Sequence, residues 1–331
     1  MACFAATGAA DRTRTQGIMG TKMCWHDPIL RVTGYLHQSY AESLSELGES
    51  VELPYAGGWI LRRQTPILNL RDAMGCYPIF CCRQWQRLGD DLAQMRKTLV
   101  SLSLVADPFG NYTLDVLKTL FDVTVPYKQH FVADLSVPLE RYTSARHRRY
   151  ARRALEKISV EVCDRPAIYL DEWVCLYDHL VTRKHITGIQ RFSRKSFAGQ
   201  LSVPGLVMFR ATEGDEPLSL DLWYVQGDVA YAHLVGTSPR GYELQASYGL
   251  KLFILRYFAS RVRWADLGAV PGVNADAYSG LASFKRGWSS ETRTAFFCGK
   301  IFNLSDYREL VRVTKSEETP FFPAYRKGEF S

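Results

Sequence analysis

Apolar and polar positions alternate along this chain with two different periods. Residues 27–48 carry apolar side chains at helical spacing and predict an amphipathic helix: Tyr35, Tyr40, Leu44 and Leu47. In residues 100–104, Val and Leu alternate with Ser, which is the period of a half-buried strand. The Asp-Pro pair at Asp107 predicts a turn after this strand.

The same patterns predict further elements up to about residue 201. Two of them are a strand at 57–63 and a helix at 83–99. A basic helix, with Thr143 or Ser144 as its N-cap, leads into a strand at 158–163. Two more helices at 171–185 and 189–201 can be separated at Gly188.

From Gly205 the pattern changes to strands. Three apolar runs separated by short polar turns predict an antiparallel meander: 206–212, 218–225 and 229–238. A helix at 243–262, a short strand at 264–270, a glycine-rich loop and a last strand at 292–302 complete the order.

The length of 331 residues suits two domains of ordinary size or one large α/β domain, and we predict two lobes. A proline and a charge pair within 164–170 mark the expected boundary. We therefore predict a flexible leader at 1–23, a first lobe at 24–165 and a second lobe at 166–331. Hydrophobic residues make up 47% and charged residues 23%, as in folded soluble proteins.

The net charge of +7 favours polyanionic partners without proving one. Its distribution is more informative, because seven of the seventeen residues in 141–157 are Lys or Arg. Arg146, Arg149 and Arg153 are spaced by three and four and form one helical stripe. Such a stripe suits phosphate groups, although a solvated helix face is the simpler interpretation.

Several classes of site and location are disfavoured. The eight cysteines show no C-x-x-C spacing and the seven histidines are scattered, so no metal site is predicted. No apolar run reaches the roughly 18 residues of a membrane span, and the leader lacks the apolar stretch of a secretory signal. We therefore expect a cytoplasmic protein.

The segment GLASFKRGWSSETRTAFF, residues 280–297, places Lys285 and Arg286 between Phe284 and Trp288. Two adjacent cations in an aromatic stretch indicate either a surface loop or a place where negative charge is received. Spacing alone leaves both interpretations open.

Three stretches resemble the Fem-type, two-lobed acyltransferases of the GNAT superfamily. They are SARHRRYARRALEKISVEV at 144–162, VAYAHLVGTSP at 229–239 with the helix and strand that follow it, and LASFKRGW at 281–288. The likeness covers roughly residues 140–305 well and the first lobe loosely. It implies an α/β (α+β) fold of two tandem GNAT-like lobes, each a mixed, largely antiparallel sheet flanked by helices.

The resemblance also implies a reaction, the transfer of an acyl group to an amine. Fem-type members take an aminoacyl group from aminoacyl-tRNA, whereas other relatives use acyl-CoA. The loop that cradles coenzyme A in a standard GNAT corresponds here to SPRGYELQAS, with Ser238 and Arg240, and its second glycine is absent. This departure favours aminoacyl-tRNA as the donor. The resemblance implies an amine of a small molecule or envelope precursor as the acceptor, and no bound cofactor.

Within the resemblance, Lys285 matches the family's Phe-Lys motif and is the first candidate for stabilising the oxyanion or a donor phosphate. Tyr231 and His233 alternate on one strand, so that His233 could accept the proton of the amine while Tyr231 orients the substrate. Asp107 lies at the end of its strand and is a further catalytic candidate. The predicted substrate-binding residues are Phe284, Arg286, Trp288, Arg240, Ser238, Arg146, Arg149 and Arg153.

Two alternatives stay open at the sequence level. The enzyme could use an acyl-CoA donor, or the chain could be a non-catalytic GNAT-like module that binds RNA or a nucleotide through the basic helix. A groove lined by Lys285, Tyr231 and His233 would favour an enzyme. The acceptor, the transferred group and the oligomeric state cannot be predicted from the sequence.

Overall fold

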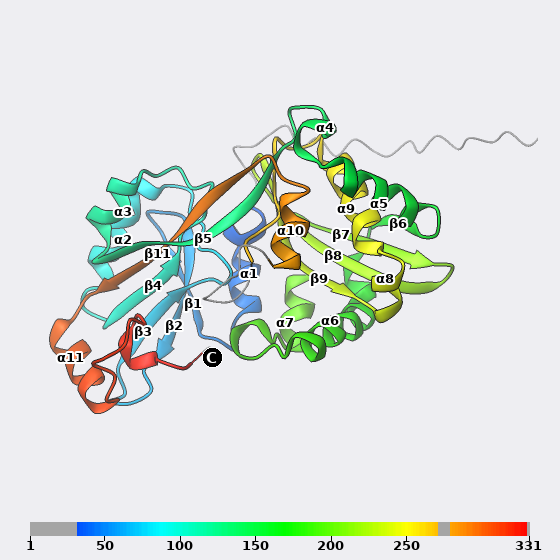
Figure 1. The fold of residues 1–331 in the computed structure, drawn as a ribbon. Helices are drawn as coiled ribbons and strands as arrows, with labels where there is room; N and C mark the ends of the chain where they lie inside the picture. The colour runs from blue at the N-terminus through cyan, green and yellow to red at the C-terminus, as the bar shows by residue number, and fades with distance from the viewer. Residues whose placement is uncertain (1–31, 271–278, 330–331) are drawn as a thin grey trace, which may run out of the picture. The chain divides into compact units, whose positions relative to one another are not determined.

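The computed structural model describes residues 32–270 and 279–329. The predicted leader at 1–23 and the glycine-rich loop at 271–278 lie outside these described residues. A single sheet of eleven strands runs through the described part, in the order β1-β2-β3-β4-β11-β5-β10-β9-β8-β7-β6. The predicted fold class, a mixed and largely antiparallel sheet with flanking helices, is confirmed (Figure 1).

The strands at one end of the sheet, with the helices that accompany them in the sequence, come from residues 34–134 and 291–326. They are η1 (Gly34–Leu36), α1 (Gln38–Ser43), β1 (Glu49–Leu53), β2 (Gly58–Gln64), β3 (Arg71–Gly75), η2 (Trp85–Arg87), α2 (Leu88–Met95), β4 (Ser101–Val105), α3 (Leu114–Leu120), β5 (Val123–Asp134), β11 (Glu291–Ile301), α11 (Leu304–Val313) and η5 (Ala324–Arg326). All neighbours among these strands pair antiparallel except β3 and β4.

The remaining elements build the other end of the sheet. They are α4 (Leu139–Tyr142), α5 (Ala145–Leu155), β6 (Ser159–Cys163), η3 (Pro166–Tyr169), α6 (Leu170–Lys184), η4 (Gly188–Gln190), α7 (Arg194–Gln200), β7 (Leu206–Glu213), β8 (Glu216–Gln226), β9 (Val229–Thr237), α8 (Pro239–Glu243), α9 (Ala246–Phe258), β10 (Trp264–Asp266) and α10 (Gly280–Arg286). The predicted meander is confirmed, since β7, β8 and β9 pair antiparallel in sequence.

Strand pairing crosses the predicted lobe boundary near residue 165 in both directions. β6, which precedes the boundary, pairs with β7, and β11, from the end of the chain, lies between β4 and β5 (Figure 1). The division into 24–165 and 166–331 therefore stays a prediction about lobes that share one sheet.

Helices cover both faces of the meander because its strands are apolar on both sides. Leu222 and Trp223 are neighbours in β8 and point in opposite directions. Leu222 packs in a core with Trp173 of α6, and Trp223 meets Phe258 of α9 at a ring distance of 5.4 Å. The meander is thus buried between α6 on one face and α9 on the other, and α5 packs against α9.

Several predicted boundaries shift in the structure. The predicted helix at 243–262 shortens to α9, because Gln245 takes a left-handed φ of 57° and separates α9 from α8, which ends at Glu243. The predicted helix at 83–99 shortens to η2 and α2. The segment around Lys285 is the short helix α10, so the surface-loop interpretation is wrong in its local structure.

Candidate functional site

Two neighbouring parallel strands separate near the centre of the sheet. β9 and β10 pair only from Val229↔Trp264 to Tyr231↔Asp266, and then β10 ends. In β9 the register against β8 shifts here: Leu222 pairs with Leu234 but Trp223 with Ala232, which leaves His233 as the extra residue of a bulge. Bulges bend a strand and are frequent next to functional sites. We call the place beyond Asp266, where β9 continues without β10 beside it, the β9–β10 gap.

The side chain of Lys285 reaches the β9–β10 gap. Its Nζ donates a hydrogen bond of 2.7 Å to the Ala269 carbonyl. A Cβ placed on Gly268 would lie 3.4 Å from this Nζ and 3.9 Å from the Ala232 carbonyl of β9. Burial lowers the pKa of Lys285 to about 8, while the Asp266 carboxylate acts in the opposite direction. A cation is thus held where the two strands diverge.

Asp107 and Tyr231, both predicted catalytic residues, are brought together. The Tyr231 hydroxyl donates to the Asp107 carboxylate at 3.0 Å, and the backbone N–H of Phe109 donates at 2.9 Å. The Cys81 thiol donates as a third partner at 3.4 Å. Burial raises the pKa of Asp107 to about 6. The carboxyl group is therefore surrounded by donors in an apolar setting.

His233 lies on the same face as Tyr231, as predicted, since both rings contact Tyr35. Its Nδ1 bonds the Tyr35 hydroxyl at 3.1 Å and its Nε2 bonds the Gln200 amide oxygen at 3.0 Å. Because an amide oxygen only accepts, Nε2 carries the proton and Nδ1 accepts from tyrosine. Burial lowers the pKa of His233 to about 3. These contacts speak against the predicted role of His233 as proton acceptor.

The sequence analysis missed a buried histidine–carboxylate pair beside the gap. His130 of β5 lies with its Nδ1 2.8 Å from Asp266 Oδ2, and the Gly268 N–H donates to Asp266 Oδ1 at 2.7 Å. His130 is 7% exposed and Asp266 2% exposed. Asp266 ends β10, a position typical of functional carboxylates, but His130 falls in a segment to which the sequence analysis assigned no element.

A fixed cation lies on the same sheet face. Arg293 of β11 pairs with His130 in the sheet register. Its guanidinium lies 4.3 Å from the ring centroid of Phe109 and 4.2 Å from that of Trp264. These contacts hold the guanidinium in place. Its Nε donates to the Glu291 carboxylate at 3.1 Å, so part of its charge is already paired within β11. The sequence did not predict a role for Arg293. The alternation of side chains in β11 shows which residues share a face, but it does not show which strand lies beside that face.

Comparison with known proteins identifies the fold. No protein-family profile and no curated protein matches the sequence. The crystal structure of FemX superposes with a TM-score of 0.62 at 14% identity, over 82% of this chain and 93% of FemX. This chain has a FemAB-like GNAT fold.

Two further structures share the FemAB-like fold. The C-terminal domain of a putative lysylphosphatidylglycerol synthetase from Agrobacterium fabrum gives a TM-score of 0.59 at 13% identity, over 85% of this chain and 91% of that domain. L-PGS from Bacillus licheniformis gives 0.54 at 13% identity, over 86% of this chain and 98% of that one. At such identities the likeness establishes the fold.

The side chains of the predicted phosphate-binding loop are engaged within the protein. The Ser238 hydroxyl caps α8 by accepting from the Gly241 N–H at 3.1 Å. The Arg240 guanidinium binds Glu213 at 2.7 Å and Glu243 at 3.1 Å. Arg240 is therefore already neutralised.

Phe284 and Trp288 lie away from the β9–β10 gap. Both rings pack around His147 of α5, at 5.9 and 5.2 Å, together with Tyr248 of α9. Arg286, on the opposite side of α10 from this cluster, has its guanidinium 6.0 Å from the Phe131 ring. In this arrangement Phe284 and Trp288 hold α10 against α5 and α9 and thereby position Lys285.

The predicted arginine stripe is on the surface of α5. Arg146, Arg149 and Arg153 are exposed, and the first two lie over the Tyr150 ring at 5.4 and 5.7 Å. The helix begins at the predicted N-cap, since the Ser144 hydroxyl accepts from the His147 N–H. The stripe and the gap are on different elements, connected through the α5–α10 contact.

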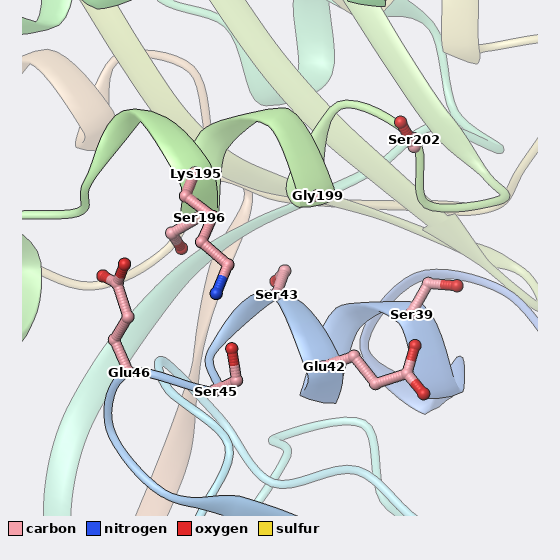
Figure 2. A pocket seen from close by; sticks show the side chains of 9 residues that line it. All are labelled: Ser39, Glu42, Ser43, Ser45, Glu46, Lys195, Ser196, Gly199 and Ser202. Carbon is pink, nitrogen blue, oxygen red and sulfur yellow. The ribbon is translucent and has the colours of Figure 1, made fainter.

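Two cavities lie elsewhere, and neither is lined by a predicted site residue. One, of about 290 Å³, lies between α1 and α7; in Figure 2 the Lys195 ammonium points across it towards α1. The other lies along α11. Within residues 32–270 and 279–329, no three His, Cys, Asp or Glu side chains group as metal ligands. No helix in this described part is long and apolar enough to cross a membrane.

Proposed function

We propose that this protein is an N-acyltransferase that forms an amide by moving an aminoacyl group from aminoacyl-tRNA to an amine. The observation that carries the proposal is the Lys285 ammonium in the β9–β10 gap of a FemAB-like fold. The Phe-Lys resemblance of the sequence leads to the same residue. A charged-tRNA donor implies that the reaction takes place in the cytoplasm.

The chemistry requires a positive group at this place. An amine that attacks an ester forms a tetrahedral intermediate, and its oxyanion needs a fixed donor. With a pKa of about 8, Lys285 is mostly protonated at neutral pH. Its present acceptor is the Ala269 carbonyl, which the oxyanion can replace. A cation that is partly withdrawn from water stabilises such charge more strongly than one in bulk solvent.

We assign the predicted residues around Lys285 to orienting the substrate and packing the site, and not to proton transfer. Asp107 is engaged by Tyr231, Phe109 and Cys81, and we assign it and Tyr231 to the orientation of the acyl group. His233 keeps the η1 segment against β9 through Tyr35. The Nε of Arg293 is paired with Glu291, and we assign the rest of its held guanidinium to a phosphate or the 3′ end of the donor.

Two features favour tRNA over coenzyme A as the donor. Arg240 is paired with Glu213 and Glu243, so the loop that holds pyrophosphate in a standard GNAT offers no unpaired arginine. The exposed stripe of Arg146, Arg149 and Arg153, by contrast, presents three cations to a phosphate backbone. Tyr150, beside them, offers a ring for base stacking.

The experiment that tests this proposal offers both donors to the purified full-length protein. Charged total tRNA and a panel of acyl-CoAs are incubated separately with a set of amines, and binding, donor deacylation and amide formation are followed as salt is raised. Salt-sensitive binding of charged tRNA with amide formation supports the proposal. Amide formation from acyl-CoA alone overturns the donor, and salt-sensitive RNA binding without any deacylation indicates a non-catalytic module.

A further inference from the structure

We propose that His130 is the residue that takes the proton from the attacking amine, and that Asp266 positions it. This inference rests on the proposed function and names a catalytic pair that the sequence analysis did not contain. Its basis is the geometry of two buried side chains on neighbouring antiparallel strands, β5 and β10.

The hydrogen bonds of Asp266 decide which nitrogen of His130 carries the proton. Oδ1 of Asp266 accepts from the Gly268 backbone N–H at 2.7 Å, and Oδ2 lies 2.8 Å from His130 Nδ1. A carboxylate in this position accepts the Nδ1–H and holds the imidazole in one tautomer. The lone pair is then on Nε2. Among the described residues, no side chain or backbone group hydrogen-bonds that nitrogen.

This pair lies next to the proposed oxyanion site. Gly268 connects them, since its N–H binds Asp266 while its α-carbon faces the Lys285 ammonium. The charge of Asp266 acts on both neighbours: it opposes the burial that lowers the pKa of Lys285, and it adds to the burial that raises the pKa of Asp107. Asp266 is therefore between the two groups already placed in the site, and His130 extends from it on the Arg293 side.

The other candidates for proton transfer are occupied. Both ring nitrogens of His233 are hydrogen-bonded, to Tyr35 and Gln200. The Asp107 carboxylate receives the Tyr231 hydroxyl at both of its oxygens, in addition to the Phe109 N–H. A base needs a lone pair that can reach the amine. His130 Nε2 has such a lone pair. Asp266 also orients the imidazole, as a carboxylate commonly orients a catalytic base.

The amine nitrogen attacks the carbonyl carbon of the aminoacyl ester, and the C–O π electrons move to the oxygen beside Lys285. His130 Nε2 takes one proton from the nitrogen. The C–N bond is kept, the bond between the carbonyl carbon and the ribose oxygen breaks, and His130 returns its proton to that ribose oxygen. The products are an amide and deacylated tRNA.

The test compares the same substitution at two buried histidines, His130→Gln and His233→Gln. Single-turnover transfer from charged tRNA is measured with a primary alkyl amine and with hydroxylamine, which is uncharged at neutral pH and loses its proton more easily. We expect His130→Gln to slow transfer to the alkyl amine about 100-fold or more and transfer to hydroxylamine much less. His233→Gln should affect both amines equally.

A second measurement separates catalysis from packing. Imidazole added to His130→Ala should restore part of the transfer to the alkyl amine, with binding of charged tRNA unchanged throughout. If His130→Ala unfolds, the ratio of the transfer rates of His130→Gln with the two amines still tests the assignment. Equal losses with both amines, or a rate for His130→Gln within threefold of the wild type, overturn the assignment while the proposed function stands. A wild-type protein that transfers to neither amine overturns the proposed function and this assignment with it.

Discussion

The Tyr231 hydroxyl donates to both carboxylate oxygens of Asp107, at 3.0 and 3.1 Å. Tyr231 is in β9, and Asp107 follows β4, so this contact joins segments that are 124 residues apart. Both residues are buried, with exposures of 3% and 4%. Water does not compete for such a bond, and a buried group that loses its hydrogen-bond partner destabilises the fold.

Tyr231→Phe should therefore destabilise the fold by about 1–3 kcal/mol, because it leaves a buried carboxyl group without its hydroxyl donor. The measurement is the free energy of unfolding in urea. Tyr242→Phe is the matched control, since Tyr242 is 41% exposed. Equal stability of the two variants would show that the contact contributes nothing.

Asp107→Asn should flatten the dependence of stability on pH. Burial raises the pKa of Asp107 from 3.8 to about 6, so the folded state binds a proton that the unfolded state has already lost between these values. The wild type therefore loses stability as pH rises from about 4 to above 6, by roughly 3 kcal/mol at most.

An asparagine cannot titrate, so this variant should gain stability relative to the wild type over the same pH range. The difference between the two unfolding free energies is compared at pH 4 and pH 7. A difference that is independent of pH would contradict the raised pKa.

Lys285→Ala should lower the rate of transfer about 10-fold to 1,000-fold, because the oxyanion loses its cation. The pH profile gives a sharper result. The ammonium loses its proton as pH rises through about 8, so transfer by the wild type should fall above that value. Lys285→Arg should keep its residual activity to higher pH, since a guanidinium stays charged.

Arg286→Ala is the control from the same helix, and it should leave this alkaline limb in place. The comparison is made on kcat/KM across pH 6 to roughly 10, a range that brackets the lowered pKa of Lys285, about 8. An unchanged rate for Lys285→Ala would remove Lys285 from the mechanism.

Replacing Arg146, Arg149 and Arg153 together by alanine should weaken tRNA binding at least about tenfold and lower the salt slope of binding by about two. The physical reason is that fewer counterions are released when fewer phosphates are neutralised. Arg312→Ala is the control, because the Arg312 guanidinium is exposed on α11 and paired with Glu309. An unchanged slope for the triple variant would indicate a solvated helix face.

Local patterns predicted the part of the fold in which neighbours in sequence are neighbours in space. The meander and the capped basic helix α5 are of this kind. The position of β11 between β4 and β5 was not predictable, because it pairs residues that are far apart in the sequence, such as Ala295 and Lys128. The alternation of side chains in a strand shows which of them share a face, but it does not identify the neighbouring strand.

The same limit explains the candidate site. Lys285, Asp107 and Tyr231 were found through a resemblance or a strand end, and the structure brings two of them into contact. His130 and Asp266 belong to β5 and β10, which are far apart in the sequence and become neighbours only when the chain folds. Their hydrogen bond could therefore not be predicted from residue spacing. The predicted roles of Phe284 and Trp288 stay untested, and their packing around His147 indicates a supporting position.

The contact between α10 and α5 provides the last prediction. A Cβ built on Gly287 would lie 2.1 Å from Cε1 of the His147 ring, far inside van der Waals contact. His147 cannot easily retreat, because its ring is packed by Tyr248 and Trp288 and its Nδ1 bonds the Ser144 hydroxyl at 2.7 Å. The Gly287 carbonyl also accepts from the Ser144 N–H at 2.9 Å.

Gly287→Ala should therefore destabilise the fold by about 1–3 kcal/mol and lower transfer, because α10 must move away from α5 and carries Lys285 with it. Gly280→Ala, at the start of the same helix, is the control: nothing lies within 4 Å of a Cβ there. It should be neutral or stabilising by up to about 1 kcal/mol, since alanine favours a helix. Urea unfolding and transfer rates are measured for both variants. If Gly287→Ala loses stability but transfers at the wild-type rate, the position of Lys285 does not depend on this contact.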